Sequence, residues 1–330
     1  MTEAEVLGDG PQRYCVEVEP STVAAGENCP LTLLARASGL SRTALKSAAT
    51  KGAVWLQTAP RAGGGRDKPR RLRRLNRVLR AGERIYFNYH AVVLAAPPAT
   101  ARLLFDGGDY SVWLKPAGMR CQGSKWGDHN TLYRYAETQL LPRRTAFIVH
   151  RLDRMTAGLV LLAHNKKSAA VLAEQFAARR VKKVYRAVVN GEPEMALPLR
   201  IDQPLEGKSA VTVLLSSQLA RQGLPSLTDV SSPVSLPTGF SLLTLSIETG
   251  RKHQIRRHLA ALGHPILGDR RYTAGDSQSS GHEVAVDLQL QAVSLSFCDP
   301  ASGERKQFSM LDKSVFDAQS ITECNNDSQY

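Results

Sequence analysis

The fold is decided by residues 149–163, which read Val149-His-Arg-Leu-Asp153-Arg-Met-Thr-Ala-Gly-Leu-Val-Leu-Leu-Ala163. Asp153 stands between two arginines, directly before an apolar run that predicts a buried strand. An arginine close to a carboxylate favours its ionised form. The stretch therefore predicts an ionised aspartate that can act as a nucleophile or base. The alternative is a structural Asp–Arg pair on a solvated turn.

On both sides of this stretch, from about residue 102, predicted strands and helices alternate. Apolar runs predict strands, and apolar residues at helical spacing predict helices. The predicted strands are 111–114, 160–163, 185–189, 242–247 and 288–297, and the predicted helices are 168–180 and 254–262. The length of 330 residues predicts one large domain and one small one.

A second segment with chemical potential is Glu248–Leu259, where a predicted strand ends and a helix begins near His253. Its cations and the backbone N–H groups at the helix start can meet phosphate oxygens, and a basic surface helix is the alternative. His253, His258 and His264 are five and six residues apart, which does not match the spacing of four in a helical ligand pair. We therefore expect no metal site.

Several segments, taken in order, resemble the motifs of the RluA family of RNA pseudouridine synthases over about residues 102–308. They are Lys115-Pro-Ala-Gly118, His150-Arg-Leu-Asp-Arg-Met-Thr-Ala-Gly-Leu159, Lys183-Val-Tyr-Arg-Ala-Val-Val189, Thr249-Gly-Arg-Lys-His-Gln-Ile-Arg256 and Gly263-His-Pro-Ile-Leu-Gly-Asp-Arg-Arg-Tyr272. The resemblance lowers the weight of the structural Asp–Arg alternative, because separate motifs agree.

The resemblance implies roles for individual residues. Asp153 matches the family's essential aspartate, Arg251 the arginine paired with it, and Tyr185 the tyrosine that packs on the extruded uracil. These three are the expected catalytic residues. Arg151 matches the arginine that helps to hold the target base out of the stack.

We also expect Ile255, Lys115 and Arg256 to contact the substrate, Ile255 from the other side of the base. The sequence departs from the usual family pattern at Met155, Ala157, Lys252, Arg257 and Gln291, which affects the RNA contacts more than the chemistry.

The implied fold is α+β, with a bent, mainly antiparallel mixed β-sheet flanked by helices and a small α/β S4-like N-terminal domain. The implied reaction breaks the N1–C1′ bond of uridine and joins C5 to C1′. It involves no net redox change and imports no group, so we expect no cofactor. One ionised carboxylate can serve as nucleophile, as partner of an oxocarbenium ion, or as base.

We expect four parts along the chain. They are an irregular extension (1–28), an S4-like RNA-binding domain with a basic insertion at 61–74 (29–94), the catalytic domain (95–312) and a disordered tail (313–330). The Gly- and Pro-containing basic insertion predicts an exposed loop without a packed core.

The charge balance of the chain indicates what kind of partner it binds. Lys and Arg number 43 against 30 Asp and Glu, and this excess favours a polyanion. We expect RNA, with ribosomal RNA first and transfer RNA second. We also expect no membrane association, a monomer, and a cytoplasmic location with five reduced cysteines. A non-catalytic RNA-binding protein and an unrelated hydrolase are the rival interpretations.

Overall fold

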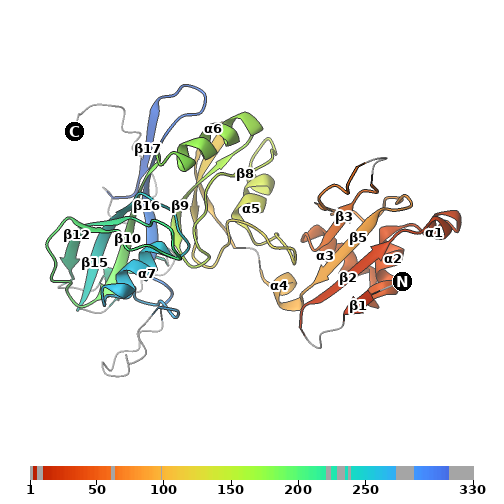
Figure 1. Ribbon diagram of the computed structural model, residues 1–330, viewed down its shortest axis with the longest axis horizontal. Helices are drawn as coiled ribbons and strands as arrows, with labels where there is room; N and C mark the ends of the chain where they lie inside the picture. The colour runs from red at the N-terminus through yellow and green to blue at the C-terminus, as the bar shows by residue number, and fades with distance from the viewer. Residues whose placement is uncertain are drawn as a thin grey trace. The chain divides into compact units, whose positions relative to one another are not determined.

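The structure is a computed structural model that describes residues 3–5, 10–60, 64–97, 99–220, 224–228, 235–236, 239–272 and 286–311. The chain divides into two compact units (Figure 1). The first comprises residues 1–98 and 122–134, and the second comprises 99–121 and 135–330. The expected tail at 313–330 lies outside the described residues, and the predicted domain boundaries stay predictions.

The first unit is a five-stranded antiparallel sheet in the order β1-β2-β5-β3-β4, with two helices packed against it. Its strands are β1 (Glu3–Glu5), β2 (Gln12–Glu17), β3 (Val54–Gln57), β4 (Arg70–Arg71) and β5 (Arg84–Tyr89). Its helices are α1 (Pro20–Ala24), α2 (Pro30–Ser38), α3 (Arg42–Thr50) and α4 (Ala91–Ala95).

Local signals define the two longer helices of this unit. Pro30 opens α2, and Gly39 ends it in the left-handed conformation with φ of 70°. Ser41 caps α3 by accepting a hydrogen bond from the backbone N–H of Ala44. Their apolar faces, with Leu34 and Leu45 fully buried, form the core of the unit against the sheet.

The prediction that residues 1–28 are irregular is wrong for the described part. β2 pairs along β5, and the ring of Tyr14 stacks on that of Phe87 with centroids 5.6 Å apart. Val18 is buried as well. The mixed polar segment becomes a strand because its pairing partner lies far along the chain, where local composition gives no signal.

The prediction of an exposed basic loop at 61–74 is also wrong in part, while residues 61–63 lie outside the described residues. Leu72 is buried in the core of the first unit. Arg71 and Arg73 form ion pairs of 2.9 and 2.7 Å with Asp128, whose side chain is fully buried. Neutralisation by this aspartate allows a basic segment to pack.

The second unit is built on a ten-stranded sheet with the main order β11-β12-β15-β10-β16-β9-β7-β6. All its strand pairs are antiparallel except β16 with β9, so the sheet is mixed and mainly antiparallel, as expected. Its strands are β6 (Arg102–Asp106), β7 (Tyr110–Lys115), β8 (Phe147–Ile148), β9 (Ala157–Ala163), β10 (Lys182–Asn190), β11 (Leu199–Ile201), β12 (Thr212–Leu219), β15 (Phe240–Ile247), β16 (Leu290–Cys298) and β17 (Arg305–Ser309). A separate pair is β13 (Leu224–Pro225) with β14 (Ser235–Leu236).

The helices that follow α4 in the described ranges are α5 (Leu132–Gln139), α6 (Lys166–Ala177) and α7 (Gln254–Ala261). Asn165 caps α6 because its side-chain oxygen accepts a hydrogen bond from the backbone N–H of Ser168. Leu172 of this helix is buried in a core shared with residues of β9 and β16. The predictions of helices near 168–180 and 254–262 are confirmed. No helix in the described ranges is both long and apolar enough to cross a membrane.

The apolar run that follows Asp153 is a central strand. Every residue of β9 is buried, and the strand lies between β7 and β16. Gly158 has φ of 116° and pairs with Ala292 of β16. A Cβ at Gly158 would lie 2.5 Å from the backbone nitrogen of Ala292. Only glycine fits this approach, which holds the start of β9 against β16.

Candidate active site

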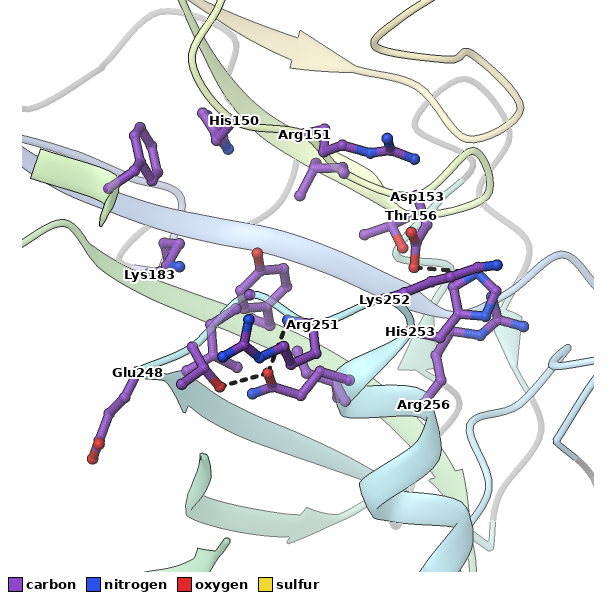
Figure 2. Close-up of a pocket in the computed structure, with 18 of the residues that line it drawn as sticks. His150, Arg151, Asp153, Thr156, Lys183, Glu248, Arg251, Lys252, His253 and Arg256 are labelled. Carbon is purple, nitrogen blue, oxygen red and sulfur yellow. Dashed lines mark hydrogen bonds and ion pairs between the residues drawn. The ribbon is translucent and has the colours of Figure 1, made fainter. Parts of the chain in front are cut away.

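The second unit contains a cavity of about 690 Å³ between three segments of the chain (Figure 2). They are the loop before β9, the region from the end of α6 into β10, and the turn from β15 into α7. The charged side chains of its lining are mainly cationic: Arg151, Arg179, Lys183, Arg251, Lys252 and Arg256 against Asp153 and Glu248. Such a lining favours an anionic ligand.

Asp153 lies on the loop between β8 and β9, with its side chain 25% exposed. Its carboxylate makes no hydrogen bond to any residue in the described part of the chain. The imidazole of His253 lies beside it, with Nε2 3.8 Å from Oδ2. Figure 2 shows the two side chains directed toward each other. The carboxylate is therefore free to act on a ligand.

Lys115 anchors the peptide that follows Asp153. Its side chain is fully buried, and Nζ donates to the carbonyl oxygens of Pro116 (2.9 Å), Met119 (2.8 Å) and Arg154 (3.3 Å). Burial lowers the pKa of Lys115 to about 8. The expected direct contact of Lys115 with substrate is not made in this geometry, because all three donors are used inside the protein and the residue is absent from the cavity lining.

His150 fixes the other end of the loop, and sequence reasoning assigned it no role. Its Nε2 accepts a hydrogen bond of 2.9 Å from the backbone N–H of Leu161, and its ring stacks on Phe176. Burial, reinforced by the positive charge of Lys183, lowers the pKa of His150 to about 3. The imidazole is therefore neutral, as an acceptor nitrogen requires.

Tyr185 and Ile255 are an aromatic and an aliphatic residue of the cavity lining. Tyr185, on β10, is 7% exposed, and Ile255, on α7, is 5% exposed. Burial raises the pKa of the Tyr185 hydroxyl, and the negative charge of Asp153 raises it further. The phenol therefore stays neutral, and its ring can pack on a flat ligand.

Arg251 also lines the cavity, but the expected ion pair with Asp153 is not formed in this structure. The guanidinium is exposed, and its Nε donates to the carbonyl oxygen of Ser209 at 2.9 Å. His253 occupies the place near the carboxylate that the resemblance gave to Arg251.

The turn that carries Arg251 is held by Gln254, which sequence reasoning also missed. Its Oε1 accepts from the Thr249 hydroxyl at 2.6 Å and from the Arg251 backbone N–H at 3.1 Å. Its Nε2 donates to the carbonyl of Val211. A buried amide with these bonds fixes the direction in which the start of α7 enters the site.

The two remaining predicted arginines differ in whether their guanidinium groups have partners within the protein. Arg151 is exposed at the cavity, and its guanidinium makes no hydrogen bond or ion pair with the described residues. Arg256 is buried and donates from Nε and one terminal nitrogen to both carboxylate oxygens of Asp269, each at 2.7 Å. This pairing uses two of the five guanidinium N–H groups, and the expected phosphate contact of Arg256 stays a prediction.

The comparisons with known proteins agree with this site. The family model described as "RNA pseudouridylate synthase" matches residues 109–261. The chain is similar to tRNA pseudouridine synthase C of Haemophilus ducreyi, at 36% identity over 171 residues, which are 48% of this chain and 68% of that protein. It is also similar to ribosomal large subunit pseudouridine synthase D of Zymomonas mobilis, at 31% identity over 218 residues, 62% of this chain and 67% of that protein.

A third relative is the dual-specificity RNA pseudouridine synthase RluA of Salmonella typhimurium, at 37% identity over 165 residues, 48% of this chain and 70% of that protein. The matched residues include Asp153 and the segments around it that form the cavity. The chain belongs to the RluA-type RNA pseudouridine synthases, which are intramolecular isomerases.

Proposed function

We propose that this chain converts specific uridines of ribosomal RNA to pseudouridine, with Asp153 as its catalytic carboxylate. The main support is the state of that carboxylate. It borders a cavity lined mainly by cations, and no described residue ties it down by a hydrogen bond. A structural aspartate at such a position would be held in a network, as Asp269 is by Arg256.

The shape of the site suits a single nucleotide. A stacked or paired uridine cannot reach a recessed carboxylate, so the base must be extruded, which costs a few kcal/mol. Packing of the uracil on the ring of Tyr185 returns about 1–3 kcal/mol. Ile255 covers the other side of the base. Arg151, exposed and without a partner among the described residues, fills the space that the base leaves in the RNA.

The chemistry then needs little beyond these groups. Asp153 meets the sugar as the N1–C1′ bond breaks, either as a nucleophile at C1′ or as a base at C2′. The uracil must turn within the site before C5 joins C1′, so it has to be held while it is detached. The neutral Tyr185 and the apolar Ile255 supply that surface and exclude water.

Arg251 has a conditional role in this proposal. Its side chain is exposed and held by one hydrogen bond to a backbone carbonyl. Such a side chain can reorient at small cost when RNA binds. We assign it to the pair with Asp153 in the RNA-bound state, where exclusion of water strengthens an ion pair.

Ribosomal RNA is favoured over transfer RNA by the first unit. This unit contains residues 29–94, which by their sequence we expect to be an S4-like RNA-binding domain. In this family such domains usually accompany ribosomal substrates. The named relatives include tRNA, ribosomal and dual-specificity enzymes, so transfer RNA is the second candidate.

The test is carbodiimide-based mapping of pseudouridine in total RNA from cells that lack the gene. The cells are complemented with the wild-type chain or with Asp153→Asn, which keeps the size of the side chain and removes its charge. Ribosomal sites that disappear and return only with wild type support the proposal. Sites confined to transfer RNA would show that the substrate is transfer RNA and not ribosomal RNA. Equal restoration by both chains would refute the role of Asp153.

A further inference from the structure

Besides the residues to which the resemblance gave roles, a histidine lies beside the carboxylate of Asp153, and a tyrosine contacts that histidine. The Nδ1 atom of His253 lies 2.8 Å from the hydroxyl oxygen of Tyr272, and Nε2 lies 3.8 Å from Oδ2 of Asp153. The two ring nitrogens of one imidazole thus face two different oxygens. The imidazole of His253 lies between the Tyr272 hydroxyl and the Asp153 carboxylate, and Figure 2 shows the side that faces Asp153.

The backbone at His253 is unusual. This residue, directly before α7, has φ of 54° and ψ of 30°, in the left-handed region. In the described part of the chain only Arg179 and Glu206 share positive φ among residues other than glycine. A residue with a side chain adopts this conformation only where its surroundings enforce it. The Gln254 bonds to neighbouring segments do so, and they direct the imidazole toward Asp153.

The position of Tyr272 is also fixed by a buried group. Its backbone N–H donates to Oδ1 of Asp269, the same carboxylate that pairs with Arg256. The guanidinium of Arg256 lies 5.0 Å from the centre of the Tyr272 ring. The hydroxyl of Tyr272 is therefore presented to His253 by a preorganised scaffold.

The charges around His253 decide which tautomer is present. Burial lowers its pKa, as do the positive charges of Arg256, Arg271 and Lys252, while Asp153 opposes them. The ring is thus neutral at neutral pH. A bare Nε2 lone pair would face the Asp153 carboxylate and be repelled by it. The favoured tautomer carries its proton on Nε2, with Nδ1 accepting from the Tyr272 hydroxyl.

We propose that His253 is a positioning residue for Asp153, with Tyr272 holding the imidazole so that its Nε2–H faces Oδ2. At 3.8 Å the contact is electrostatic rather than a hydrogen bond, and it favours one orientation of the carboxylate while leaving both oxygens able to meet the nucleotide. The inference rests on the proposed role of Asp153. In this enzyme the carboxylate is then oriented by the start of α7 before RNA arrives and before Arg251 reorients.

The test uses total RNA labelled with [5-³H]uridine from cells that lack the gene. Joining C5 to C1′ releases the C5 hydrogen, so tritium release reports the isomerisation under single-turnover conditions. The variants are His253→Asn and Tyr272→Phe. Asparagine tolerates the left-handed backbone and can reach Tyr272, but it is too short to reach Asp153. His264→Asn, a histidine outside the cavity lining, is the matched control.

We expect His253→Asn to slow tritium release about 10- to 100-fold with RNA affinity unchanged. Tyr272→Phe should slow it about 3- to 10-fold, and the double variant should be no slower than His253→Asn alone. Because the inferred role is to orient the carboxylate, the loss should fall on the rate constant at saturating RNA. A purely structural role would also weaken RNA binding, and the effects of the two substitutions would add.

The outcomes separate the inference from the function on which it rests. No tritium release by wild type, or equal release by Asp153→Asn, would remove the proposed function itself. An inactive Asp153→Asn beside unchanged rates in His253→Asn and Tyr272→Phe would overturn the positioning role alone. If His253→Asn does not fold, Tyr272→Phe decides, because it removes only one hydroxyl group.

Discussion

His150 allows a test of how the catalytic loop is held, through the pH dependence of its local stability. The ring accepts a hydrogen bond from Leu161 at the centre of β9, and its pKa is lowered to about 3 by burial. An unfolded histidine titrates near 6.5. Above that pH both states are neutral and there is no effect. Below it the unfolded state binds a proton that the folded state refuses, so stability falls as the pH falls.

The magnitude follows from one proton. The loss approaches about 1.4 kcal/mol per pH unit below 6.5, which is about 2 kcal/mol at pH 5 relative to pH 8. The matched variant is His150→Gln, because the amide oxygen can accept from Leu161 and does not titrate. Hydrogen exchange of a peptide covering β9 measures the opening free energy in both proteins. The intrinsic exchange rates cancel at each pH.

We expect the ratio of wild-type to variant exchange rates to rise about 30-fold between pH 8 and pH 5. The buried His164 and His258 are common to both proteins and drop out of the comparison. A ratio that stays flat would refute the reasoning, since it would mean that His150 takes up a proton in the folded state. A ratio that falls would show that the folded state prefers the charged ring.

Substitutions at three further positions test the framework of the site by urea denaturation. Gly158→Ala should lower the free energy of unfolding by about 4 kcal/mol or more, because the added methyl meets the Ala292 backbone, and a near-neutral effect would contradict the close pairing. Lys115→Met leaves buried carbonyl oxygens without donors and should lower it by about 3 kcal/mol, reducing turnover more than RNA affinity. Arg256→Met should lower the free energy of unfolding by about 3–5 kcal/mol, because it leaves the buried Asp269 without its partner. Arg256→Lys keeps the positive charge and should lower it less. Equal losses in the two variants would argue against a charge effect.

The predictions from sequence succeeded where the signal was local. The helices near 168–180 and 254–262 follow from apolar spacing, and the buried strand after Asp153 follows from its composition. They failed at β2 and at the basic segment before Leu72, where polar or cationic residues pack because of partners distant in the chain. Propensity and periodicity contain no information about such partners.

The sequence by itself determined the family, the order of the motifs and the aspartate on which the proposed chemistry depends. Only the tertiary structure decided which groups surround that aspartate. His253 lies beside Asp153, Lys115 ties down the peptide after it, and Arg251 is bonded to Ser209. The reason is physical: the partner of a charged group is set by the register of strands and by the direction in which a helix enters the site. Both depend on packing across the whole sheet rather than on neighbouring residues.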